Sequence, residues 1–377
     1  MAMTTALHMF ADNSDKLEEQ WKQRDAEAGI EREEAFYDLK FRVRKKDGEY
    51  KEIPAPEPAL EGPVADVHCH LSMLDNRDLS LARSAAYNIN LMVCVTDIVE
   101  DAGSVYSSMG GWIMSAGAWQ HVIDKDSFVF DPIIRLTCGC HPHNAKDYNS
   151  SVESGLLERL ADKRTCALGE IGLDYHYDFS PRDRQQKVFR RQLQLAHRTG
   201  LPVQLHIREA HEDALRILDE EGMPEGGCVL HCCTLGPKEL EPWLERDCYI
   251  SVGGSVTFAS CDDLRESVKI IPANRLLTET DSPYMAPVPL RGRKCSPEFA
   301  VFTAEKIAEI RGCEPGDARR ELLATMFKNA RDLFDRGATT WQMSARYSAG
   351  RPNETASAPK LQGLFAMPCR GASPTIG

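Results

Sequence analysis

An aspartate and two histidines alternate at the end of an apolar run, "VADVHCHLSM", at residues 64–73. Side chains at every second position of a strand share one face, so Asp66, His68 and His70 are expected to point the same way. Two imidazoles at this spacing can bind one metal ion at a strand end. Asp66 lies one step deeper and is expected to accept the N–H of a ligand imidazole. The two histidines alone are a weak signal.

Further ionisable residues follow or end later apolar runs: His141, His143, Glu170, His206, His231 and Asp281. Any one histidine in an apolar strand is more often a satisfied core group than a ligand. Burying the whole set without compensating charge would be costly. Divalent metal ions provide that compensation, because they bind neutral imidazoles and ionised carboxylates. The set therefore indicates a metal centre.

Eight short apolar runs occur along this part of the chain, and six of them contain or directly precede these residues. They are 64–69, 91–96, 133–139, 165–172, 202–207, 228–233, 249–254 and 275–281. Most are continuous rather than alternating, which is typical of parallel strands covered on both faces. Helix-like segments separate most of them. The pattern predicts an α/β chain folded as a (β/α)8 TIM barrel, and barrel enzymes carry their chemistry at the C-terminal strand ends. An open doubly wound sheet gives a similar pattern.

The clearest helix is expected over 181–199. Ser180 is its predicted N-cap, Pro181 suits the first helical position, and Gly200 can end it. Its expected inner stripe consists of Val188, Phe189, Gln192, Leu193, Leu195 and Ala196.

The chain is expected to have three parts. Residues 1–62 form a charged N-terminal extension with a basic hairpin around Asp47-Gly48 and a proline-rich linker. Residues 63–336 form the barrel. Residues 337–377 are rich in Ser, Pro, Gly and Ala, and are expected to be a flexible tail, either disordered or loosely docked.

Composition restricts the function classes. The 377 residues carry a net charge of −12, which argues mildly against tight, non-specific binding of nucleic acid. No apolar run approaches the ~18 residues of a membrane span, so no membrane association is expected. The N-terminus lacks the features of a signal peptide, and thirteen scattered cysteines fit a reducing compartment. We therefore expect a cytoplasmic or nuclear location.

Several motifs occur in order along the barrel: "DVHCHL", "GCHPHNA", "LGEIGLDYHYD", "LPVQLHIREA", "LHC", "SVGGSVTF" and "LLTETDSPYMAP". With them the sequence resembles the TatD-like metal-dependent hydrolases, a family of nucleases within the amidohydrolase superfamily. The resemblance covers residues 64–335, and "GEIGLDY" and "ETDSPY" are its most specific parts. Two stretches depart from the family pattern, "HCCTLGP" after the sixth run and "RGRKCSPEF" after the eighth.

The resemblance implies a divalent-metal phosphodiesterase acting on DNA or RNA, often as a 3′–5′ exonuclease on single strands. It also implies the metal ligands His68, His70, Glu170, His206, His231 and Asp281.

A two-metal mechanism is predicted for phosphodiester hydrolysis, with Mg, Mn or Zn as the ions. Glu170 would lie between the ions. One ion is expected at His68, His70 and Asp281, and the other at His206 and His231. Asp281 would orient and deprotonate the water. The alternative for Asp281 is a turn cap, since "DSPY" is a good turn sequence.

Other polar and aromatic residues near the predicted mouth are candidate substrate contacts. Charged imidazole at His141 or His143 would bind phosphate or protonate the leaving oxygen, and the alternative is that one of them stabilises the loop. The remaining candidates are Arg208, Tyr175, Tyr284, Arg291, Arg293 and Lys294, for which the alternatives are salt bridges, core packing and simple solvation.

Two further functions stay open. The same metal site would serve a small-molecule amidohydrolase or phosphoesterase, because fold does not fix substrate. A non-catalytic metal-stabilised scaffold is the third possibility, with residues 1–62 binding a protein partner that the sequence does not identify. A basic groove beside the metals would distinguish a nuclease from a small-molecule hydrolase.

Overall fold

The computed structural model describes residues 41–46, 48–55, 61–123 and 132–349, together with isolated positions between 19 and 29. Residues 56–60 of the proline-rich linker and residues 350–377 lie outside the described residues. None of the described helices combines the length and the apolar character that a membrane crossing requires.

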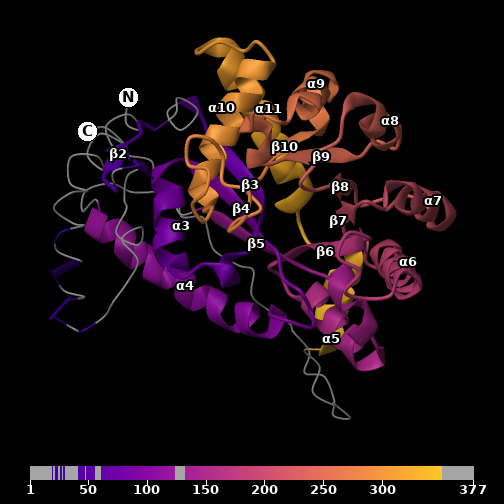
Figure 1. The fold of residues 1–377 in the computed structure, drawn as a ribbon. Helices are drawn as coiled ribbons and strands as arrows, with labels where there is room; N and C mark the ends of the chain where they lie inside the picture. Colours follow the sequence, from indigo (N-terminus) through magenta and orange to yellow (C-terminus); the bar gives the residue numbers. More distant parts are fainter. Residues whose placement is uncertain are drawn as a thin grey trace, which may run out of the picture.

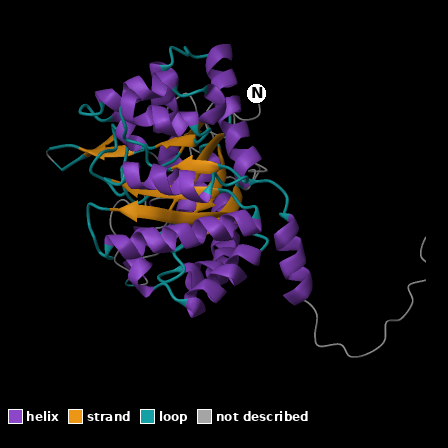
Figure 2. Ribbon diagram, turned by 90° about the vertical axis from the view of Figure 1, so that its right-hand side faces the viewer, coloured by secondary structure: helices purple, strands orange, loops and turns teal. Residues whose placement is uncertain are grey.

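Eight parallel strands form one sheet in sequence order, and helices surround it (Figure 1). The strands are β3 (Val64–Cys69), β4 (Ile89–Cys94), β5 (Ile133–Cys138), β6 (Thr165–Asp174), β7 (Val203–Arg208), β8 (Cys228–Leu230), β9 (Tyr249–Val252) and β10 (Leu276–Thr278). Figure 2 shows the strands in the interior with helices on both sides. The predicted TIM barrel is confirmed.

Helices connect and follow the strands. They are α3 (Arg77–Ala86), α4 (Ala102–Ile123), α5 (Ser150–Ala161), α6 (Arg182–Thr199), α7 (His211–Glu221), α8 (Pro237–Glu245), α9 (Asp262–Ile270), α10 (Ala300–Ile310), α11 (Asp317–Phe334) and α12 (Thr340–Ala349). Short 3-10 turns, η2 (Leu71–Met73), η3 (Pro142–Asp147), η4 (Gly254–Thr257), η5 (Ala273–Arg275) and η6 (Pro297–Phe299), lie in the connections.

Helix α6 has the buried stripe and the C-terminal glycine that its sequence predicts. All six residues of its predicted inner stripe are buried, and Gly200 ends the helix in the left-handed conformation at φ 67°. The N-cap is Pro181 rather than Ser180. The Ser180 hydroxyl is used elsewhere, because it donates to the carbonyl of His143 at 2.7 Å and accepts from the Lys146 N–H at 3.0 Å.

Side-chain hydrogen bonds help to join the first strand, β3, to the last strand, β10. The Thr278 hydroxyl donates to the carbonyl of Ala65 at 2.6 Å. The buried carboxylate of Asp66 accepts from the Thr280 N–H at 2.9 Å and from the Thr280 hydroxyl at 2.6 Å. These bonds fix the two strand ends that carry His68 and Asp281.

Strands β6 and β7 approach closely at Gly172. This residue has φ +149°, and an added Cβ would lie 2.0 Å from the carbonyl oxygen of His206. Only glycine fits there. The close approach sets the spacing between Glu170 on β6 and His206 on β7.

The predicted basic hairpin is present as β1 (Arg42–Arg44) paired antiparallel with β2 (Tyr50–Glu52). The buried ring of Phe41, at its base, packs against Tyr87 at 4.4 Å and Phe302 at 4.8 Å between ring centroids. This part of the N-terminal extension is therefore joined to the barrel core.

The structure differs from the expected tail over residues 340–349, which form α12. Gln342 is buried, and its amide donates to the carbonyls of Leu160 at 2.8 Å and Thr165 at 3.1 Å. Arg346 donates to the carbonyl of Ala161 at 2.6 Å. The helix docks through these polar bonds to backbone and through Trp341, which packs against the hydrophobic core. A composition rich in small and polar residues does not reveal such contacts.

Replacing Phe41 by alanine tests the anchoring of the extension. We expect the free energy of unfolding to fall by about 3 kcal/mol, because a buried aromatic side chain is removed from a packed cluster. Urea denaturation followed by tryptophan fluorescence measures it. The matched control is Tyr50→Ala in the same hairpin, whose side chain is 39% exposed. Equal effects of the two substitutions would contradict the anchoring role.

Candidate functional site

The carboxylate of Glu170 lies at the centre of the site, with its two oxygens facing different imidazoles. Oε2 is 3.6 Å from Nε2 of His68 and 4.0 Å from Nε2 of His70. Oε1 is 2.7 Å from Nδ1 of His206 and 2.7 Å from Nε2 of His231. Burial alone would raise the pKa of Glu170, but the surrounding imidazoles hold it well below its usual range. The carboxylate is therefore ionised.

Asp281 follows β10 and faces the first pair of histidines. Its Oδ1 is 3.5 Å from Nε2 of His70 and 3.9 Å from Nε2 of His68. Burial would raise the pKa of Asp281, but the hydrogen bond with His70 and the other imidazoles lower it. The side chain therefore points into the site, and only its backbone carbonyl takes part in the following turn, accepting from Tyr284.

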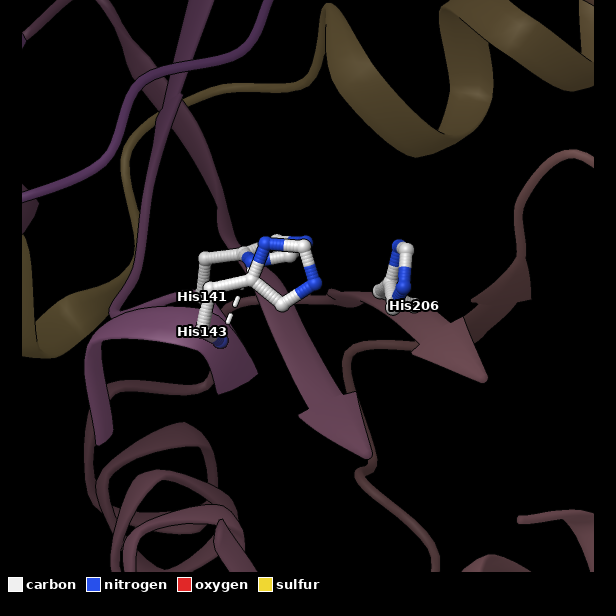
Figure 3. Close-up of side chains that lie close together, drawn as sticks. All are labelled: His141, His143 and His206. Carbon is white, nitrogen blue, oxygen red and sulfur yellow. Dashed lines mark hydrogen bonds between the residues drawn. The ribbon is translucent and has the colours of Figure 1, made fainter. Parts of the chain in front are cut away.

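The structure brings all six predicted metal ligands together. Two groups have ligand atoms within 4.8 Å of one another: His68 with His70 and Asp281, and His68 with Glu170 and His231. A third such group consists of His141, His143 and His206, whose rings lie on two sides of one space (Figure 3).

His68 provides the clearest indication that these residues fit a metal ion. It is fully buried, and neither ring nitrogen has a hydrogen-bond partner in the described part of the chain. Burial lowers the pKa of His68 to about 4, so the imidazole is neutral. A buried, unpartnered imidazole beside ionised carboxylates is the donor set that a divalent cation requires.

Asp174, at the end of β6, was not predicted as a site residue. Its Oδ2 lies 3.0 Å from Nε2 of His206 and 3.0 Å from Nε2 of His143. The bond to Asp174 keeps a proton on Nε2 of His206, so that Nδ1 faces Glu170 and His231. The position of this carboxylate at a strand end, in "GLDY", was the available signal.

Glu279, just after β10, was also missed. It is fully buried and accepts from the Cys232 N–H at 2.6 Å. Its Oε1 lies 3.8 Å from Nδ1 of His231, the nitrogen that points away from Glu170. Burial raises the pKa of Glu279 to about 7. Through its bond to Cys232, Glu279 holds the backbone that follows β8, next to His231.

The role expected for Asp66 needs correction. Its carboxylate accepts from the backbone N–H of His68 at 3.3 Å and from Thr280, rather than from a ligand imidazole. Asp66 is buried between two strand ends, where backbone donors from both ends and the Thr280 hydroxyl bond to its carboxylate. It acts on the backbone that carries the ligands.

His141 and His143 lie in the connection after β5, and the predicted charge of His141 needs correction. Nδ1 of His141 accepts from the backbone N–H of His143 at 3.2 Å (Figure 3). The proton is therefore on Nε2, which lies 3.8 Å from Oε1 of Glu170. Burial holds the pKa of His141 well below its usual range. This imidazole is neutral and can donate one N–H into the site.

Two buried glutamines of α6 fix the connections that carry these groups. Gln192 accepts from the Cys140 N–H at 2.7 Å and donates to the Cys140 carbonyl at 3.0 Å. Gln185 makes the same pair of bonds to the backbone of Asp174, at 2.8 and 2.9 Å. The backbone before His141 and at Asp174 is thereby held to one helix.

The predicted aromatic contacts divide into two cases. The hydroxyl of Tyr175 donates to Asp213 at 2.7 Å and accepts from Gln186. Tyr175 is therefore part of the protein's own packing and not a substrate contact. Tyr284 is 51% exposed, and its ring centroid lies 6.5 Å from that of His70. Tyr284 therefore remains available at the mouth.

The predicted basic cluster is largely engaged with the protein. Arg293 donates to the carbonyl of Arg42 at 2.6 Å, and Lys294 pairs with Asp75 at 2.6 Å. Arg291 lies over the ring of Phe258 at 4.2 Å.

Arg208 is exposed at the end of β7, with its guanidinium 4.8 Å from the ring centre of Tyr177.

The chain resembles known proteins over the whole barrel. Residues 65–335 match the family described as TatD related DNase. The uncharacterized metal-dependent hydrolase YcfH of Escherichia coli K12 is 35% identical over 286 residues, covering 74% of this chain and 98% of that protein. The 3′-5′ ssDNA/RNA exonuclease TatD of Escherichia fergusonii is 34% identical over 209 residues, covering 52% of this chain and 76% of that protein.

A solved structure shows the same fold. The crystal structure of YJJV, a TatD homolog from Escherichia coli K12, superposes with a TM-score of 0.60 at 24% identity, covering 72% of this chain and 98% of that structure. Residues 65–335, which match the family, contain every residue of the site described above. The chain belongs to the TatD related DNase family of metal-dependent hydrolases.

Proposed function

We propose that this hydrolase is a divalent-metal-dependent nuclease that hydrolyses phosphodiester bonds in single strands of DNA or RNA from the 3′ end. One observation carries the proposal: the two oxygens of Glu170 face two separate sets of imidazoles. A shared carboxylate of this kind suits two adjacent cations, which phosphodiester hydrolysis uses. The name of the exonuclease relative supports the substrate class.

Of the two proposed ions, we assign one to His68, His70 and Asp281. We assign the other to His206 and His231, with Glu170 between them. Divalent ions held there would polarise the phosphodiester and lower the pKa of a bound water. The donor set of imidazoles and carboxylates accommodates Mn or Zn and also allows Mg.

The side chains at the site have distinct tasks in this proposal. Asp281 stays ionised because its pKa is lowered, so it can orient a water and accept its proton. Neutral His141 directs its Nε2–H toward the space beside Glu170 and can donate a hydrogen bond to a phosphoryl oxygen. Asp174 keeps His206 oriented through its hydrogen bond to Nε2, and Glu279 places a carboxyl group 3.8 Å from Nδ1 of His231.

A small-molecule phosphoesterase is the second candidate. The pairing of Arg293 and Lys294 with other groups of the protein favours it, because less basic surface is left near the mouth for a nucleic-acid backbone. Activity toward small phosphodiesters without any cleavage of oligonucleotides would select this candidate.

Glu170→Gln is expected to lower nuclease activity by at least about 100-fold, because loss of groups that only support a metal ligand already costs roughly 10- to 100-fold. Protein loaded with Mg, Mn or Zn is incubated with 3′- and 5′-labelled single- and double-stranded DNA and RNA. The products are resolved on denaturing gels.

The matched control is Glu158→Gln, on the exposed face of α5, which should cleave like wild type. Absence of cleavage by wild type with all three metals would refute the nuclease proposal. Undiminished cleavage by Glu170→Gln would refute the assignment of the site.

Metal affinity is expected to rise with pH up to about 9. Burial would lower the pKa of His206, but hydrogen bonds to Asp174 and Glu170 raise it to about 9. Below that pH the imidazole carries a second proton, which must leave before the ring can bind metal. Competition with a chromophoric chelator for Mn, at several pH values below 9, should show a roughly ten-fold gain in affinity per pH unit for one released proton.

His206→Asn should bind metal more weakly and with a flatter pH dependence. A pH-independent affinity of the wild-type protein over the same range would show that His206 carries no competing proton.

A further inference from the structure

Two large aromatic side chains are stacked in solvent in the connection between β6 and α6. Tyr177 is 47% exposed and Phe179 is 56% exposed. Their ring centroids lie 5.2 Å apart, and the ring planes differ by 10°. Side chains of this size usually bury most of their surface in a core or an interface. The exposed pair is therefore suited to a planar partner from outside the chain.

The aromatic pair lies directly beside the candidate metal centre. Both rings meet the imidazole of His143 edge-on, Phe179 at 4.7 Å and Tyr177 at 5.6 Å between centroids. His143 in turn shares the carboxylate of Asp174 with His206. A ligand on the pair would thus be separated from the metal ligands by one imidazole.

The connection that carries the pair is held in place before any ligand binds. The Tyr177 N–H donates to Oδ1 of Asp174 at 3.0 Å, while Oδ2 of the same carboxylate holds His206. Lys146 donates to the carbonyl of Phe179 at 3.3 Å. A prearranged surface of this kind binds its ligand with a smaller cost of ordering.

A positive charge accompanies the rings. The guanidinium of Arg208 lies 4.8 Å from the ring centre of Tyr177 and makes no hydrogen bond or ion pair with other described residues. The neighbouring carboxylate of Glu209 is engaged by His176 at 2.6 Å. An exposed cation next to stacked aromatic rings matches a nucleotide, whose base stacks while its phosphate meets the cation.

The site also presents exposed apolar surface next to His70. Tyr284 and Met73 are 51% and 47% exposed, and the Tyr284 hydroxyl contacts the Met73 sulfur at 3.8 Å. Exposed aromatic surface therefore borders the site on the His70 side and on the His143 side. Only an unstacked base has a free face for such surfaces, which favours single strands over duplexes.

We propose that Tyr177 and Phe179 form a stacking platform for a nucleobase of the single-stranded substrate, with Arg208 at an adjoining phosphate. This inference rests on the proposed nuclease function and adds a binding site to it.

The test varies the protein and the substrate together. The full-length, Mn-loaded protein is compared with Y177A/F179A on an oligothymidylate and on the same strand with 5,6-dihydrothymidine at its 3′ end. The saturated base keeps the backbone and the hydrogen-bonding groups but lacks an aromatic face. We expect Y177A/F179A to lower kcat/KM on oligothymidylate by about ten-fold, and to change it by less than about two-fold on the saturated strand.

Three further measurements make the outcome decisive. The ring-preserving variant Y177F/F179Y should retain the wild-type preference for the aromatic base. Tyr347→Ala removes a 67% exposed aromatic ring from α12 and should leave the preference unchanged. Metal content of every variant should equal that of wild type.

Two contrary results have different meanings. If wild type cleaves neither strand, the nuclease proposal fails and the platform fails with it. If wild type cleaves both strands and Y177A/F179A keeps the wild-type preference, the nuclease proposal stands and the platform is wrong.

Discussion

The structure depends on one buried carboxylate, that of Glu170, held ionised among imidazoles from other strands and connections. An ionised carboxylate away from water is costly unless opposite charge or hydrogen-bond donors surround it. Here one oxygen faces His68 and His70, and the other faces His206 and His231. A parallel barrel satisfies this need, because its strand ends converge at one face.

Buried polar side chains around the site fix the positions of these strand ends and connections. Asp66 joins the backbones of the first and last strand ends, and Asp174 holds the outer nitrogen of His206. Gln185 and Gln192 tie the backbone of two connections to α6. Each of these groups constrains the backbone or the side chain of a residue at the centre. The geometry of the centre is therefore a property of the barrel and not of flexible loops.

The six metal ligands were expected from the resemblance to the family, and metal binding by them stays a prediction. The sequence itself predicted the barrel well, because continuous apolar runs are local patterns. It failed where a role depends on partners distant in the chain. The Tyr175 hydroxyl is hydrogen-bonded to Asp213 and Gln186, and the exposed aromatic rings next to it are those of Tyr177 and Phe179. The docking of α12 likewise depends on Gln342 meeting carbonyls of α5 and β6. Spacing alone does not show which of several neighbouring polar or aromatic residues is already engaged.

The most direct test of the central claim, that Glu170 is shared by two ions, is electron paramagnetic resonance of the Mn-loaded protein together with metal analysis. Wild type is predicted to bind two Mn ions per chain and to give a spin-coupled spectrum, since ions that share a carboxylate lie roughly 3.5–4 Å apart. Glu170→Ala is predicted to lose the coupling and at least one ion. Two uncoupled ions in wild type, or an unchanged coupled pair in Glu170→Ala, would contradict the claim.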